Sequence, residues 1–258
     1  MTHVLEGATL GGGYSKVIVS SDDRFRFFVH EDSRPPVSIP LSIRNLHVDN
    51  HLVVFGQKPR VSVIEHLFSA LYGLDLYGVR IDVFGDELPI FDGSSKRFGE
   101  ALRQFEKRRS LDALKIHDRV EIRSHGSFLC YEPTDRNALY IDMELHHPYI
   151  QTQRITLDIN AESYMREIAS SRTFVFTDEH DPRLRDLPPY GIGITQDAVY
   201  SAEPARFKNE LVRHKVLDLL GDLYVLQGRI VGKITARNTS HDLNMQFVKT
   251  VLSREREP

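Results

Sequence analysis

Three ionisable side chains recur at every fourth position in residues 211–222, a segment apolar enough to form a buried helix. They are His214, Asp218 and Asp222, and on an α-helix this spacing places them along one stripe. A buried helix holds an imidazole and two carboxylates only if they have partners, because unpaired buried polar groups are costly. Zinc would be such a partner. His214 and Asp218 are spaced as two ligands of one ion, and a third ligand would leave a position open for water.

Two other segments carry residues that could complete such a site. The helix-like run 62–73 holds Glu65 and His66 side by side in apolar surroundings, and His241 lies where a strand is expected to give way to a helix. His66 is the candidate for the third ligand. These are the components of a zinc hydrolase, in which the metal lowers the pKa of a water, the glutamate accepts its proton and the histidine serves the leaving group or the oxyanion.

A second histidine pair, His47 and His51, does not fit the same role. The apolar residues 52–55 beside it indicate an extended segment, in which the two histidines would lie about 13 Å apart and could not share an ion. We interpret this segment as an exposed strand or turn. A helical histidine–aspartate pair taken alone is also compatible with a surface ion pair, so the zinc interpretation depends on the three segments together.

Composition and charge restrict the class of protein. With 41% hydrophobic and 27% charged residues among 258, the chain has the composition of a soluble globular protein. Its net charge of −3 gives no basic field, so we expect no nucleic-acid partner. The single cysteine, Cys130, excludes an internal disulfide and a multi-cysteine metal site. Because we find neither a signal peptide nor an apolar run of about 18 residues, we expect a cytoplasmic monomer without a transmembrane segment, acting on a small molecule.

The order of predicted elements repeats on either side of a charged stretch at 106–110. In each half, two or more strands precede a helix, a strand and a second helix, and the ionisable helix stands in the corresponding place. We therefore predict an α+β protein of two related two-layer domains, 1–110 and 111–258, with the site at their interface. The predicted elements are strands at 16–20, 24–29 and 78–84 with helices at 62–74 and 94–107, then strands at 120–122, 139–143 and 230–234 with helices at 211–226 and 243–252, residues 144–210 being read as irregular.

At these residues the chain resembles the UDP-3-O-acyl-N-acetylglucosamine deacetylases, the zinc amidases that commit a sugar nucleotide to lipid A synthesis. The resemblance covers most of the chain, with the blocks in family order and at family-like spacing. It implies two α+β domains packed helix to helix. The matching blocks are residues 63–67, 87–94, 171–174, 212–218 with 221–222, and 240–244.

The resemblance also implies a role for each residue of the site. His66, His214 and Asp218 would bind zinc, and Glu65 would be the general base on the zinc water. His241 would stabilise the oxyanion or protonate the departing amine. The remaining roles follow by position: Asp222 would support His241, Thr173 would donate its hydroxyl to the oxyanion, Phe174 would shape the substrate passage, Lys215 would meet phosphate or the reacting carbonyl, and Arg237 would contact substrate.

The chain departs from the family pattern at several places that bear on substrate, one of them residues 193–195, where Gly-Ile-Thr stands for the usual Gly-Gly-Ser. The insert that in the family walls a tunnel for a long acyl chain is polar here, at 177–186. Asn238 stands where many members carry a basic residue, although Arg237 is adjacent, and Leu145 stands where an aromatic residue often precedes the histidine–proline pair. The polar insert favours a substrate with a short acyl group or none, because charges facing an apolar tunnel would be desolvated.

The sequence thus predicts a zinc-dependent N-deacetylase acting on a UDP-linked N-acetylglucosamine, as in lipid A synthesis. One alternative is a divergent relative that deacetylates another N-acetyl amino sugar or a nucleotide lacking a long acyl chain. Another is a catalytically silent relative that binds a sugar nucleotide. A third is a zinc amidase that acts on an amide outside the sugars.

Overall fold

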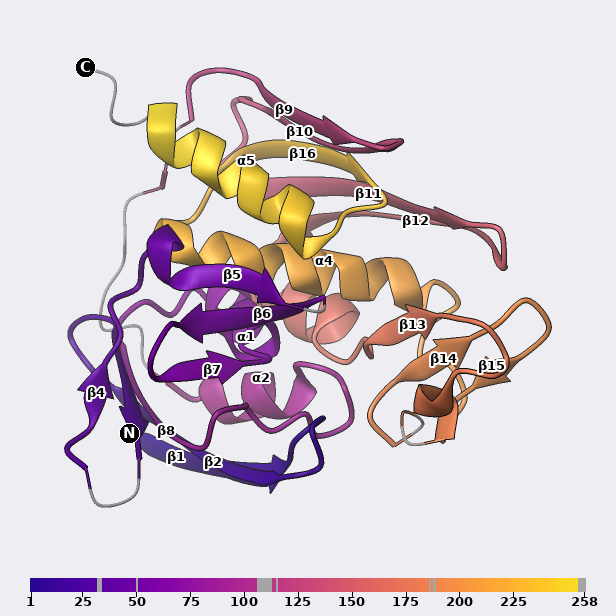
Figure 1. Ribbon diagram of the computed structural model, residues 1–258. Coiled ribbons are helices and arrows are strands. Elements are labelled where there is room, and N and C mark those ends of the chain that lie inside the picture. Colours follow the sequence, from indigo (N-terminus) through magenta and orange to yellow (C-terminus); the bar gives the residue numbers. More distant parts are fainter. Residues whose placement is uncertain are drawn as a thin grey trace.

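Two five-stranded sheets enclose the helices in the computed structural model (Figure 1). Helices α1 (Glu65–Gly73) and α2 (Lys96–Leu102) line the first sheet, whereas α4 (Glu210–Leu223) and α5 (His241–Arg254) line the second. The expected α+β class, with helices between the sheets, is confirmed. The structure describes residues 1–31, 34–49, 51–105, 113–114, 116–185, 187 and 189–254.

The first sheet has the strand order β1-β2-β8-β3-β4. Its β8 runs parallel to β3, and the other neighbouring pairs are antiparallel. Alternation explains which face is covered: in β2, Val17 and Val19 are buried toward the helices while Ile18 between them is half-exposed. The strands are β1 (Thr2–Ala8), β2 (Tyr14–Ser21), β3 (Arg26–His30), β4 (Val37–Ser38) and β8 (Val79–Phe84).

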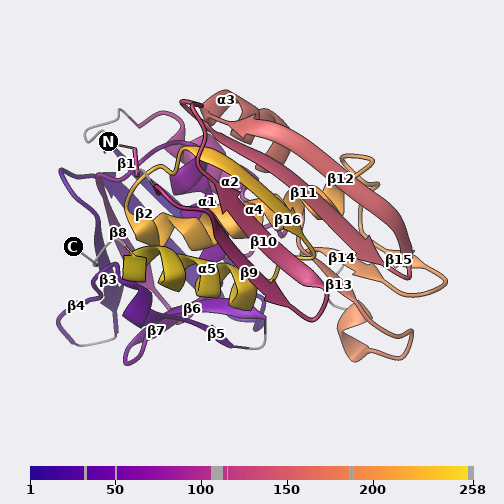
Figure 2. The same cartoon turned by 90° about the horizontal axis from the view of Figure 1, so that it is seen from above.

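The second sheet repeats this topology with the order β9-β10-β16-β11-β12 (Figure 2). Here β16 runs parallel to β11 and the other pairs are antiparallel, as in the first sheet. The stretch 106–110 lies outside the described residues, so the boundary between 1–110 and 111–258 stays a prediction. The strands are β9 (Val120–Ser124), β10 (Ser127–Glu132), β11 (Leu139–His147), β12 (Ile150–Ile159) and β16 (Gly232–Arg237).

The region 144–210, which we expected to be irregular, contains further regular structure. Strand β12 escaped prediction because it is an edge strand in which only Ile155 and Ile159 are buried, so its apolar alternation is weak. The other elements there are too short for a periodic signal. They are α3 (Ala161–Ser163), the π-helical turn η2 (Tyr164–Ile168), η3 (Pro182–Arg185), and the sheet β13 (Phe174–Phe176), β14 (Ile192–Ile194) and β15 (Val199–Tyr200).

The remaining elements modify the prediction in detail. The helix expected at 94–107 ends at Leu102, and the helix expected to reach Leu226 closes with the 3₁₀ turn η4 (Tyr224–Leu226). His47 is exposed on a strand of a small sheet and His51 is exposed in the following turn, as predicted. That sheet follows η1 (Ile43–Asn45) and consists of β5 (Leu46–Asp49), β6 (Leu52–Gly56) and β7 (Arg60–Ser62).

Helices α1 and α4 pack directly against each other between the two sheets (Figure 1). A Cβ atom at Gly221 of α4 would lie 2.4 Å from the carbonyl oxygen of Glu65 on α1, so only glycine permits this approach. The first turn of α1 is thereby brought against the stripe of ionisable residues on α4. Within the described part of the chain, no helix is long and apolar enough to span a membrane.

The close approach of α1 and α4 predicts that Gly221→Ala destabilises the protein by about 1–3 kcal/mol, because backbone atoms of α1 must move to accept the methyl group. Urea unfolding followed by circular dichroism measures the change. Gly99→Ala in α2 is the matched control, since its Cβ would meet the flexible end of Met165 instead of backbone. Equal stability of the two variants would contradict the proposed constraint.

Candidate active site

The chain enters α1 through a tight turn that places Glu65 and His66 inside the molecule. Val63 has φ 61°, a left-handed conformation that is unfavourable for a β-branched residue. The turn is held because the Ser62 N–H donates to Asp86 O at 2.9 Å and the Leu88 N–H donates to Ser62 O at 3.0 Å. The first turn of α1 is consequently buried, with both ionisable side chains facing α4.

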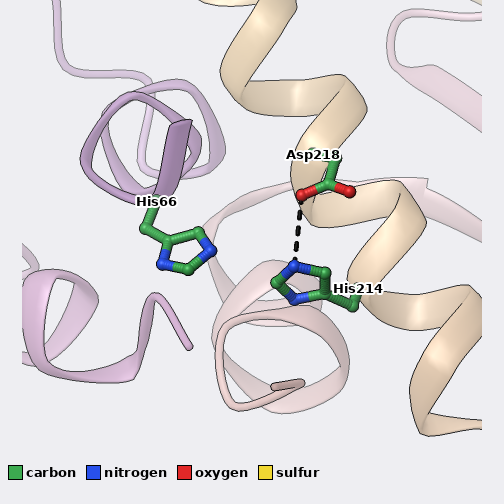
Figure 3. A group of neighbouring side chains, drawn as sticks. All are labelled: His66, His214 and Asp218. Atoms are coloured by element: carbon green, nitrogen blue, oxygen red, sulfur yellow. Dashed lines mark ion pairs between the residues drawn. The ribbon is translucent and has the colours of Figure 1, made fainter. Parts of the chain in front are cut away.

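Three of the predicted residues converge on one point between α1 and α4. One ligand atom from each of His66, His214 and Asp218 lies within 4.8 Å of the others, and all three residues are buried. The Nε2 atom of His214 lies 3.2 Å from Oδ1 of Asp218, and the two imidazole rings are 5.3 Å apart at 86° (Figure 3). Two imidazoles and one carboxylate form the donor set of a catalytic zinc site that retains an open position.

The charge states of these groups suit metal binding. Burial, together with His214, lowers the pKa of His66 to about 3, so its ring is neutral and has a free lone pair. Burial alone would raise the pKa of Asp218, but His214, Lys215 and His241 hold it well below the usual range. His66 and Asp218 are therefore present in the forms that a metal ion requires.

Glu65 is a buried carboxyl group next to this convergence. Burial raises its pKa to about 7, although His241 opposes the shift. Its Oε2 atom, like Nδ1 of His66, has no hydrogen-bond partner among the described residues. A carboxyl that titrates near neutrality can both accept and release a proton, and its unpartnered oxygen suits a polar ligand at the same point.

His241, the first residue of α5, is anchored by Asp222. Its Nδ1 lies 2.8 Å from Oδ2 of Asp222, which also accepts a hydrogen bond from Nδ2 of Asn244 at 2.8 Å. Its Nε2 lies on the side of the three potential ligands, 4.0 Å from Oδ1 of Asp218. Burial would lower the pKa of His241, but Asp222, Asp218 and Glu65 raise it to about 9. The ring is thus a cation near neutral pH, with an N–H directed at the site.

Lys215 and Phe174 border the same point. Lys215 Nζ lies 3.1 Å from Oδ2 of Asp218 and 5.3 Å from the centroid of the Phe174 ring, which in turn lies 6.1 Å from the His214 ring. Thr173, half-buried, precedes this ring. Its backbone N–H donates to Gly93 O at 2.7 Å, so the residue is held against the turn that leads into α2.

Arg237 occupies a different environment at the end of β16. Its Nε lies 2.9 Å from Oε1 of Glu144 on the neighbouring strand, and both side chains are partly exposed. The following residue, Asn238, has φ 50° and accepts a hydrogen bond from the His146 N–H at 2.7 Å. The structure therefore pairs Arg237 with Glu144 and brings the other nine predicted residues to the α1–α4 interface or its border.

Two functional candidates were missed by the sequence analysis. Glu210 lies one turn before His214 on the same stripe of α4, where it forms a buried ion pair with Arg172. Asn244 lies one turn after His241 and contacts Asp222. Extending the four-residue spacing backward from His214 would have found Glu210, and the three-residue spacing from His241 would have found Asn244.

Comparison with known proteins identifies the family of the chain. Residues 15–253 match the family model described as UDP-3-O-acyl N-acetylglycosamine deacetylase. Proteins named UDP-3-O-acyl-N-acetylglucosamine deacetylase from Aquifex aeolicus and Geotalea uraniireducens are each 31% identical, over 95% and 86% of this chain and 88% and 76% of theirs. One from Xylella fastidiosa is 33% identical over 88% of this chain and 79% of its own. The chain therefore belongs to the UDP-3-O-acyl-N-acetylglucosamine deacetylase family.

Proposed function

We propose that this chain is a zinc-dependent deacetylase that hydrolyses the acetamide of a UDP-linked N-acetylglucosamine carrying a 3-O-acyl group, the substrate for which its relatives are named and which leads to lipid A. The observation that carries the proposal is the convergence of His66, His214 and Asp218 beside Glu65. Water adds to the acetamide carbonyl carbon, the carbon–nitrogen bond breaks, and the products are acetate and the free amine.

In this proposal His66, His214 and Asp218 hold the zinc ion. A zinc ion bound there would polarise the acetamide carbonyl and lower the pKa of a water molecule. Glu65 is the proton acceptor, because its pKa of about 7 allows it to take a proton from the attacking water and to release it later. Burial of the carboxyl raises its pKa, so in this proposal the reaction depends on the first turn of α1 being buried.

His241 acts on the leaving side of the reaction. Asp222 holds its Nδ1–H, so the proton available for transfer is the one on Nε2. This proton can stabilise the oxyanion or pass to the departing amine nitrogen. Thr173 would add a hydroxyl donor for the oxyanion, Lys215 would bind phosphate or the carbonyl, and Phe174 would form a wall of the passage. Arg237 would contact the substrate at the rim by exchanging its ion pair with Glu144.

We also propose that the protein works as a monomer in the cytoplasm. Its one cysteine, Cys130, is buried and free, which suits a reducing compartment. A catalytically silent relative is the weaker alternative, because a silent protein would have no need of a buried glutamate with an unpartnered oxygen beside the three potential ligands.

The insert between β13 and β14 bears on the acyl group. Its charged residues 178–180, 183 and 185 are exposed, and the half-buried Asp181 is paired with Arg183, so these charges do not oppose an apolar passage. Leu184 does oppose it, because this buried side chain covers β14: a Cβ at Gly193 would lie 2.4 Å from Leu184 Cδ2. A long acyl chain that ran over β14 would have to displace Leu184, which favours the alternative of a relative that takes a short acyl group or none.

Replacing Glu65 by Gln should lower turnover by about two orders of magnitude or more, because the amide cannot accept the proton. Acetate release from the UDP-linked 3-O-acyl substrate measures turnover, and elemental analysis of the same sample measures zinc. Zinc should remain at about one ion per chain in this variant and fall sharply in His214→Ala, which removes a ligand. A Glu65→Gln protein as active as the parent would refute the mechanism.

Replacing Asp222 by Asn should lower the pKa of His241 in the metal-free protein from about 9, because the nearest stabilising charge is lost. Titration of the imidazole protons by NMR measures this, with the exposed Asp242→Asn as control. Since the raised pKa contributes stability below about pH 6.5 that is lost as pH rises through about 9, Asp222→Asn should also weaken the pH dependence of unfolding in this window. An unchanged titration would contradict the assignment.

Lengthening the 3-O-acyl group should improve kcat/KM little in the parent enzyme. An apolar passage would stabilise the bound acyl chain by roughly 0.8 kcal/mol for each buried CH₂, and a chain that ran over β14 would meet Leu184 there. In Leu184→Ala the gain from a 14-carbon chain over no chain should increase. A hundredfold gain already in the parent would show that a long-chain passage exists elsewhere in the molecule.

A further inference from the structure

A buried ion pair lies at the start of α4, one helical turn before His214. Arg172 and Glu210 have side chains only 3% and 2% exposed, and their contact is bidentate: Nε to Oε1 at 2.8 Å and Nη2 to Oε2 at 3.0 Å. Breaking a buried pair of this kind by removing one partner is strongly unfavourable, because it leaves an uncompensated charge.

Every hydrogen-bonding group of this pair is used. Beyond Glu210, the Arg172 guanidinium donates to Ser201 Oγ at 2.9 Å and to Pro204 O at 3.0 Å. Glu210 in turn accepts hydrogen bonds from two backbone N–H groups, that of Arg172 at 3.1 Å and that of Arg206 at 2.7 Å. The carboxylate thus ties the start of α4 to the segment that precedes β13.

One of these contacts leads straight to a potential metal ligand. The N–H of Arg172, which donates to Glu210, belongs to the same peptide group as the C=O of Ser171. That carbonyl accepts a hydrogen bond from Nδ1 of His214 at 3.0 Å. Because the trans peptide directs its N–H and C=O in opposite directions, Glu210 and His214 hold the two ends of one planar unit.

The chemistry of this chain of contacts is directional. A carbonyl oxygen only accepts, so Nδ1 of His214 must donate to it, and Nε2, the nitrogen that faces Asp218, is left as the atom that could bind a metal. A carboxylate on the N–H end of a peptide polarises the C=O end, since hydrogen bonds in series strengthen one another. In many metal sites a carboxylate contacts the ligand histidine directly, whereas here a peptide group lies between them.

We propose that Arg172 and Glu210 are positioning residues that fix the tautomer and orientation of His214 through the Ser171–Arg172 peptide, and thereby raise the affinity of the site for its metal. The proposal rests on the metal centre proposed above. Arg172 neutralises and immobilises the carboxylate of Glu210, and this carboxylate accepts the hydrogen bond from the N–H of the Ser171–Arg172 peptide. Thr173 and Phe174 follow on the same pinned segment, so the pair also sets the backbone from which they extend.

Two double variants separate this role from general stability. Arg172→Met with Glu210→Leu removes both charges and leaves the backbone N–H of residue 172 without its acceptor. Arg172→Met with Glu210→Gln also removes both charges, but its amide oxygen can still accept a hydrogen bond from that N–H. Replacement of a buried ion pair by apolar groups is often tolerated. Zinc affinity is measured by competition with a chromophoric chelator, the cobalt-substituted protein is examined by absorption, and unfolding is followed without metal.

The Leu-containing variant should bind zinc about 10- to 100-fold more weakly than the Gln-containing one, the range expected when a partner of a ligand histidine is lost, and its cobalt spectrum should change. Asp142→Asn, which breaks a two-contact ion pair with Arg154 on the second sheet, is the control and should leave zinc affinity unchanged. Equal zinc affinity in the two double variants would overturn the proposal.

Two further measurements cover the cases in which the first comparison fails or is ambiguous. If the Leu-containing variant does not fold, Arg172→Met with Glu210→Gln should still bind zinc more weakly than the parent, because a neutral amide polarises the peptide less than a carboxylate; unchanged affinity in that folded variant would overturn the proposal. His214→Ala separates this inference from the proposed function. Retention of zinc affinity in His214→Ala would refute the metal centre itself, whereas its loss together with equal double variants would refute only the positioning role.

Discussion

The close approach of α1 and α4 is the constraint on which the site depends. Each helix brings ionisable groups that water would otherwise solvate, and the glycine at 221 lets the backbone of one helix touch the other. At this separation His66 of α1 reaches His214 and Asp218 of α4. A larger residue at 221 would separate the helices, and His66 would then lie too far from His214 and Asp218 for the three to share a ligand. Packing and chemistry are consequently set by the same contact.

Burial accounts for much of the chemical character of the site. It raises the pKa of Glu65 to about 7 and keeps His66 neutral, while the ring of His241 stays charged only because Asp222, Asp218 and Glu65 surround it. The proposed base, ligand and acid are therefore distinguished by their neighbours as much as by residue type. The unfavourable turn at Val63 is one local sign of what the fold tolerates in order to place Glu65 there.

Much of this arrangement could be predicted from the amino-acid sequence, for identifiable reasons. The stripe on α4 and the pair Glu65–His66 stand out because ionisable residues in apolar helices are rare, and the repeated order of elements revealed the two sheets. Strand β12 could not be predicted because an edge strand alternates weakly. The contact of Glu210 with the Ser171–Arg172 peptide could not be predicted either, since it depends on how the segment before β13 folds back onto α4.

The origin of the three potential ligands has a consequence for the life of the protein in the cell. His66 comes from the half of the chain that builds the first sheet, and His214 and Asp218 come from the half that builds the second. An ion held by all three would therefore join the halves as a cross-link, and it would bind the folded chain far better than the unfolded one. Ligand binding of this kind multiplies the ratio of folded to unfolded chain by 1 + L/Kd, where L is the free ligand concentration. Under metal scarcity the chain would then lose abundance through proteolysis as well as activity.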